Sequence, residues 1–199
     1  MPLLDHFHAP LAPVRRWESF HVNWAGAMAD ALNEQLLPDG FFAEEHANLE
    51  AVPDRFEVLV FNDNATATLV AAIELVSPGN KDFESNRRAF AVKCVSLLCR
   101  GVSLVVIDIV TNRLANLHNE IMGLLGRPEA CALPRDARLY SAAYQPQLHG
   151  GGLNIDIWPE CLAIGKSLPI LPMSLNAEVC LRLDLEATYM VARQRRRLA

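Results

Sequence analysis

The spacing of apolar positions changes along the first half of the chain. Between residues 17 and 36 they recur every three or four positions, which predicts a helix that ends at Pro38-Asp39-Gly40. Ser85 is the expected cap of a second helix, which Gly101 ends. Three short apolar runs before this second helix and one after it predict strands, at residues 41–48, 56–62, 68–76 and 103–109.

This order of elements, αβββαβ, predicts an α/β (α+β) fold with a mixed sheet. The strand–helix–strand connection should make 68–76 and 103–109 parallel neighbours, because such a crossover returns the chain in the same direction. The helix at 17–36 is expected to bury Phe20, Trp24 and Met28 against one face of the sheet.

The pattern is weaker in the second half of the chain. It predicts an amphipathic stretch, a β-hairpin, an irregular segment rich in Pro and Gly, and a closing helix, at residues 114–125, 139–144 with 153–158, 158–172 and 184–197. We expect residues 1–199 to form a single domain in which 139–199 is a C-terminal extension packed on the core.

The composition fits one folded domain. Of the 199 residues, 51% are hydrophobic and 21% charged, which is enough to bury a full core. No apolar run approaches the roughly 18 residues of a membrane span, and the N-terminus lacks the order of a signal peptide. We therefore expect no membrane partner and a cytoplasmic location. The five cysteines show no metal or redox spacing, which indicates reduced thiols.

The net charge of -5 argues against a general nucleic-acid binder, because such proteins gather Lys and Arg over a whole face. One basic run exists, with four arginines between Arg193 and Arg197. A solvated helix end, favoured by the helix dipole, is the preferred interpretation over a phosphate contact.

A carboxylate interrupts the most apolar predicted strand. Glu74 lies near the end of the run from Leu69 to Val76, where a charge is costly unless it is paired, solvated or bound to a cation. If this run pairs antiparallel with 56–62, Glu57 lies directly opposite Glu74, with Cβ atoms about 5 Å apart. Two carboxylates so close repel each other unless one is protonated or a cation lies between them.

Mg²⁺ or Mn²⁺ suits such a pair, because Mg²⁺ takes oxygen ligands, keeps several waters and activates one of them against a phosphodiester. Glu44 and Glu45 on the preceding strand offer a third carboxylate, so the candidate metal ligands are Glu57, Glu74 and Glu45. The alternative is a register shift of one residue that leaves Glu57 and Glu74 apart at solvated strand ends.

A lysine completes this chemistry in many metal-dependent nucleases, because its ammonium stabilises developing charge and orients the attacking water. Two lysines are candidates for this catalytic role beside Glu74. Lys81 lies just after the turn at Pro78-Gly79, and Lys93 lies on the following helix. A solvated Lys93 with a buried stem remains the alternative. Asp108 ends an apolar strand at the sheet edge where sites gather, or caps the next turn.

The chain resembles an uncharacterised bacterial family in which a similar strand, E-x-L-S-P-x-N-K, precedes L-V-E-I-D. The resemblance extends over most of the chain, and the segments that carry it lie at residues 73–81, 103–108, 17–21, 157–160, 168–172 and 183–189. The core of that family is similar to restriction endonucleases abundant in cyanobacteria, of the PD-(D/E)XK nuclease superfamily. The resemblance implies a nuclease-like αβββαβ core.

The resemblance also assigns residues to the nuclease pattern. The first acidic position, commonly Asp, falls on Glu57, and the lysine of E-x-K falls on Val76. A lysine moved to the helix at Lys93 would substitute for it. Two functions stay open: Mg²⁺-dependent hydrolysis of DNA, with Asp108 or Glu45 in support, or a non-catalytic binding or assembly module that forms a homodimer.

Overall fold

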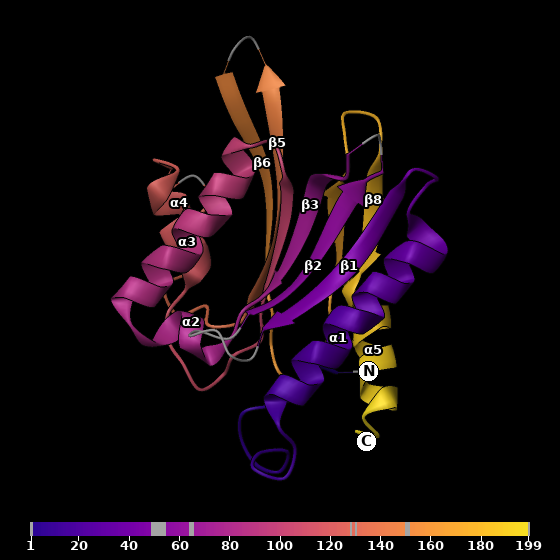
Figure 1. The fold of residues 1–199 in the computed structure, drawn as a ribbon. Helices are drawn as coiled ribbons and strands as arrows, with labels where there is room; N and C mark the ends of the chain where they lie inside the picture. The colour runs from indigo at the N-terminus through magenta and orange to yellow at the C-terminus, as the bar shows by residue number, and fades with distance from the viewer. Residues whose placement is uncertain are drawn as a thin grey trace.

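The computed structural model describes residues 2–48, 55–63, 66–127, 129, 131–149 and 152–198. In these ranges the chain forms a six-stranded sheet with helices on both faces and a separate two-stranded sheet (Figure 1). No helix in the described ranges is long and apolar enough to cross a membrane. The elements are α1 (Trp17–Ala31), η1 (Leu32–Leu36), β1 (Phe41–Asn48), β2 (Arg55–Asn62), β3 (Thr68–Leu75), α2 (Pro78–Asp82), α3 (Glu84–Cys99), β4 (Ser103–Asp108), α4 (Leu117–Leu124), β5 (Tyr140–His149), β6 (Gly152–Cys161), β7 (Ile170–Ser174), β8 (Cys180–Asp184) and α5 (Leu185–Arg195).

The large sheet is mixed and follows the order of the sequence, β1-β2-β3-β4-β5-β6. Strands β3 and β4 pair in parallel, and every other pair of neighbours is antiparallel. The predicted mixed sheet and the predicted parallel pair are both confirmed. Because β3 and β4 run the same way, their carboxyl ends meet at one edge, beside the start of β2.

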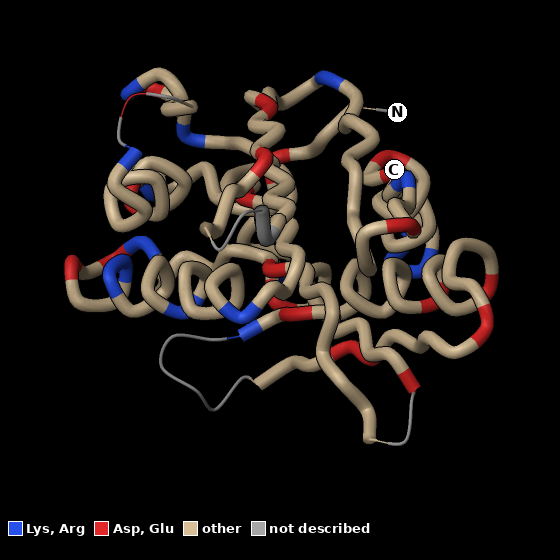
Figure 2. The backbone as a smooth tube through the Cα atoms, turned by 90° about the horizontal axis from the view of Figure 1, so that it is seen from above, with Lys and Arg blue, Asp and Glu red and all other residues tan. Residues whose placement is uncertain are grey.

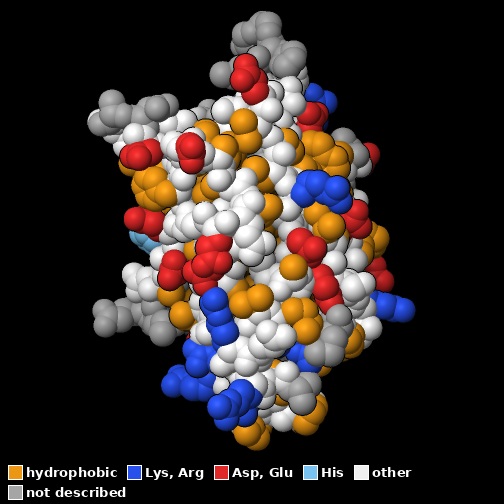
Figure 3. Space-filling view, turned by 90° about the vertical axis from the view of Figure 1, so that its right-hand side faces the viewer, with side chains coloured by type: hydrophobic (Ala, Val, Ile, Leu, Met, Phe, Trp, Pro, Cys, Tyr) orange, Lys and Arg blue, Asp and Glu red, His pale blue; other side chains and the backbone are white. Residues whose placement is uncertain are grey.

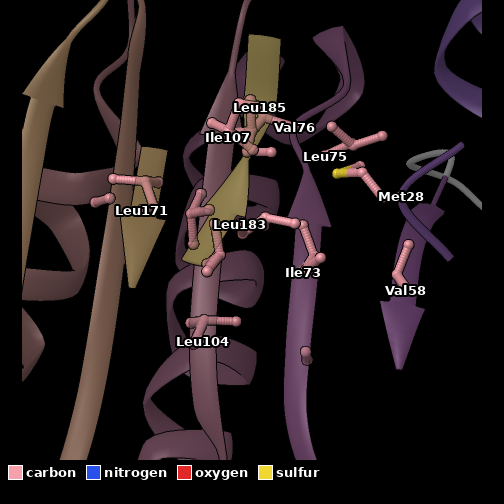
Figure 4. Packing of buried hydrophobic residues seen from close by; sticks show 14 of the residues in the cluster. Met28, Val58, Ile73, Leu75, Val76, Leu104, Ile107, Leu171, Leu183 and Leu185 are labelled. Atoms are coloured by element: carbon pink, nitrogen blue, oxygen red, sulfur yellow. The ribbon is translucent and has the colours of Figure 1, made fainter. Parts of the chain in front are cut away.

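The sheet has a different cover on each face, and Figure 2 shows helices on both sides of it. Helices α3 and α4 pack together on one face; α1, α5 and the β7–β8 sheet lie on the other. Figure 4 shows Met28, Ile73 and Leu183 among the buried residues that form the core on this second face. Trp24 is fully buried there and donates a hydrogen bond to Thr188 Oγ1 at 3.1 Å, so its predicted burial is confirmed.

The helices of the first half differ from the predictions in three ways. Helix α1 ends at Ala31 and continues as the π-helical turn η1, instead of running as one α-helix to residue 36. Helix α3 begins at Glu84, before the expected cap Ser85. The turn at Pro78-Gly79 is the start of a short helix, α2, in which Ser77 and Asn80 form a reciprocal capping box.

The second half holds more strands than its pattern predicted. The expected hairpin is longer: β5 pairs with β4, so β5 and β6 extend the large sheet, and their far end rises above the other strands (Figure 1). The segment predicted as irregular contains the end of β6 and the first residues of β7. Pro159 is tolerated in β6 because this strand lies at the edge of the sheet, where alternate N–H groups need no partner strand.

Candidate active site

The two predicted carboxylates face each other across the β2–β3 hairpin. Glu57 pairs directly with Glu74, as predicted, although the ladder has an irregularity between Val60 and Phe61. Neighbouring residues on a strand point to opposite faces. Phe56 packs against Trp17 beneath α1. Glu57 and Glu74 therefore lie on the other face, under α3.

Lys93 bridges the two carboxyl groups from helix α3. Phe90 and Leu97, three residues before it and four after it, are buried, which places Lys93 beside the sheet-facing side of the helix. Its Nζ donates a hydrogen bond to Glu57 Oε2 at 2.6 Å and lies 2.6 Å from Glu74 Oε1. The second contact is an ion pair only, because Glu74 Oε1 accepts no aligned hydrogen bond from the described residues.

The facing carboxyl groups have pKa values shifted in opposite directions. Burial raises the pKa of Glu74 to about 7 against the attraction of the Lys93 ammonium, and the Glu57 charge adds to the rise. Burial is also the largest single influence on Glu57, but the hydrogen bond and charge of Lys93, with smaller contributions from Glu74 and His46, together outweigh it and lower the pKa of Glu57. Glu74 thus gains and loses its proton around neutral pH, while Glu57 stays ionised.

The cluster of Glu57, Glu74 and Lys93 opens to two hollows. A cavity of about 250 Å³ between the sheet and the helices α2 and α3 is lined by Glu74 and Lys93, with Asn80, Asn86 and Arg55. A wider hollow of about 530 Å³ at the ends of β1 and β2 is lined by Glu57 and again by Arg55. Small molecules therefore reach the carboxyl groups from two sides, past one arginine.

The preceding strand contributes a histidine to this face in place of the predicted third carboxylate. In the β1–β2 pairing, Glu45 lies opposite Val58, and alternation turns it to the face that carries α1. Glu45 lines the wider hollow but makes no ion pair with Lys93 in the described part of the chain. His46 lies directly opposite Glu57 and adds to the lowering of the Glu57 pKa.

The second candidate lysine, Lys81, belongs to a separate ion pair. Its Nζ lies 2.7 Å from Asp108 Oδ2, and both side chains are fully buried. The ammonium also donates to the carbonyl oxygens of Arg138 at 3.2 Å and Val110 at 3.5 Å. Burial raises the pKa of Asp108 to about 6, although Lys81 opposes the rise. Lys81 and Asp108 therefore lie outside the Glu57 cluster.

Four polar residues around the cluster were missed from the sequence: His46, Arg55, Asn80 and Asn86. Pairing the predicted strand 41–48 with 56–62 as well would have drawn attention to His46, which the register of the β1–β2 ladder places opposite Glu57. Arg55 is the first residue of β2, two positions before Glu57 and on the same face. Asn80 lies in the motif at residues 73–81 but received no role there, and nothing local marks Asn86; the positions of both depend on the unforeseen helix α2.

In the described residues, no group of three or more His, Cys, Asp or Glu side chains is arranged to hold a metal ion. Any metal in this cluster would therefore rest on Glu57 and Glu74, and Mg²⁺ is commonly held by one or two carboxylates together with waters and substrate phosphates. Comparisons of the chain with protein-family models, curated proteins and solved structures found no match.

Proposed function

We propose that this protein is a metal-dependent phosphodiesterase that acts on DNA through Glu57, Glu74 and Lys93. The observation that carries the proposal is the lysine held 2.6 Å from each of two facing carboxyl groups, at the edge where β3 ends. The order α1, β1 to β3, α3, β4 and the resemblance to the PD-(D/E)XK core support the same conclusion.

The donor set fits Mg²⁺ or Mn²⁺, because two carboxylates converge and Glu74 Oε1 receives no aligned hydrogen bond from the described residues. Glu57 and Glu74 would hold the ion, which supplies an activated water when bound. Glu57 offers a permanent negative charge, and Glu74 offers one after it releases its proton. Lys93 would then donate to a phosphate oxygen or orient the water, a role that suits an ammonium at the cavity wall.

A plasmid-nicking assay tests this function. The native protein with Mn²⁺ should convert supercoiled DNA to the open-circular form, and Glu57→Gln, Glu74→Gln and Lys93→Ala should each lose at least about 100-fold in rate, the usual scale for a general acid–base or charge-stabilising group. Glu45→Gln and Lys166→Ala are the matched controls, since they remove the same charges outside the cluster, and both should keep the native rate.

A second candidate is a non-catalytic nuclease-like module that binds a partner or forms a homodimer. The charge balance of the cluster favours it, because the Lys93 ammonium lies 2.6 Å from both carboxyl groups and offsets part of their negative charge. On this account no variant nicks DNA, Mn²⁺ leaves the melting temperature unchanged, and sedimentation shows a dimer. Nicking that Glu45→Gln retains and Glu74→Gln loses would reject it.

A further inference from the structure

A cavity far from the carboxylates is walled by arginines. It has a volume of about 190 Å³ and lies where the N-terminal segment, the start of α1 and the end of α5 meet. Its lining includes His6, Ser19, Leu198 and three arginines, Arg15, Arg16 and Arg196. In the space-filling view of Figure 3, basic side chains gather at the lower end of the visible face, and acidic side chains dominate above them. The protein as a whole has a net charge of -5, so this concentration of positive charge is local.

The positive charge at this cavity is not neutralised by the described residues. Within the described residues, Arg15 and Arg196 make no ion pair. The Arg16 side chain is 82% exposed and has only a 3.8 Å contact with Glu18. A fourth cation, Arg193, is only 3% exposed. Buried charges are costly unless paired, and Arg193 has no anionic partner among the described residues.

Arg193 itself is poorly satisfied. Its guanidinium donates only long hydrogen bonds, to the carbonyl oxygens of Pro2 at 3.4 Å and Leu198 at 3.5 Å. Its buried Nε has no partner among the described residues. Since Leu198 also lines the cavity, Arg193 adds its charge directly behind the cavity wall.

His6 brings an unpaired donor to the same wall. Its ring is 3% exposed, stacks on Phe20 and places Nε2 2.8 Å from the Tyr189 hydroxyl. That hydroxyl accepts from the backbone N–H of Leu4, so its own proton is free to go to His6 Nε2. Burial lowers the pKa of His6 to about 3, and the ring is neutral. In the tautomer in which the Tyr189 hydroxyl donates to Nε2, the single ring proton sits on Nδ1, which has no partner among the described residues.

We propose that this cavity is a binding site for a phosphate group, either inorganic phosphate or the phosphate of a small phosphomonoester. Arginines present forked donors that match phosphate oxygens, and the first N–H groups of the 15-residue helix α1 favour an anion at the same place. His6 Nδ1–H and the Ser19 hydroxyl add neutral donors. The site shares no residue with the Glu57 cluster, so the two proposals stand or fall separately.

Calorimetric titration with sodium phosphate, at constant ionic strength in chloride, tests the site. The native protein should bind one phosphate, and Arg15→Gln/Arg196→Gln should weaken binding by about tenfold or more, because charge-assisted hydrogen bonds are lost. Arg100→Gln/Arg197→Gln is the matched control; it removes two exposed arginines outside the lining and should change the affinity by less than about twofold. Equal weakening by both double variants would show general charge attraction and overturn the proposal.

Nitrogen-15 NMR of histidine gives an independent readout that needs no substitution. The Nδ1–H signal of His6 should shift on addition of phosphate and stay in place on addition of chloride. A signal that phosphate leaves unchanged would overturn the site as placed. In competition, a 5′-phosphorylated trinucleotide should displace phosphate and its 5′-hydroxyl form should not; equal displacement by both would show that internucleotide phosphates are bound, and would reject a phosphomonoester site.

Discussion

Two lysine–carboxylate clusters lie at the same edge of the sheet and differ in almost every physical respect. Lys81 and Asp108 form a one-to-one pair with fully buried side chains, and two backbone carbonyls complete the shell of the ammonium. Lys93 faces two carboxyl groups and is 31% exposed beside a cavity. The first cluster is closed to solvent, whereas the second has an extra carboxyl group and access from solvent.

The difference indicates which cluster is suited to cation binding and catalysis. In the closed pair, removal of either charge leaves the other buried and unpaired. In the open cluster, removal of the Lys93 charge is partly compensated by protonation of Glu74, because the pKa of Glu74 is raised to about 7. A site that binds and releases cations needs this exchange, and a structural ion pair does not.

The largest expected effect comes from breaking the closed pair. Lys81→Met should cost about 3 to 5 kcal/mol of unfolding free energy, because Asp108 is left buried without its partner. Lys81→Met/Asp108→Asn should recover much of this loss, since no charge stays buried. Urea denaturation at pH 7 measures both. A loss smaller than that of Lys93→Met would reverse the comparison between the two clusters.

The open cluster should show its own pH dependence. With a folded pKa of about 7 against 4.5 unfolded, Glu74 keeps a proton in the folded state that the unfolded state has lost, so its contribution to stability falls as pH rises through this window. Between pH 5 and pH 8 the native protein should lose roughly 2 kcal/mol relative to Glu74→Gln. The two proteins unfolding with parallel pH profiles would show that Glu74 ionises normally.

Lys93→Met should cost the least, about 1 kcal/mol at pH 7, because a proton on Glu74 compensates for the missing ammonium. The same change should raise the pKa of Glu74 further, since Lys93 is the main group that lowers it. Carbon-13 NMR of the Glu74 carboxyl group, titrated in both proteins, measures the shift. An unchanged titration curve would mean that the 2.6 Å contact does not persist in solution.

The sequence predicted those parts of the molecule that depend on short-range patterns. The pairing of Glu57 with Glu74 followed from one hairpin and from the alternation of buried positions. This pairing is present although the ladder is irregular after Val60. The burial of Lys81 was missed because its partners Asp108 and Arg138 come from distant elements. Strand β8 was also missed, although its alternation of buried and exposed residues was legible.

Calorimetric titration with Mn²⁺ at pH 7 tests the central claim, that Glu57 and Glu74 together form a cation site, most directly. We expect the native protein to bind one ion and to release part of a proton, because Glu74 must ionise to bind it. Glu57→Gln and Glu74→Gln should abolish binding, and Glu45→Gln should retain it. Absence of binding to the native protein, or unchanged binding by Glu74→Gln, would contradict the account.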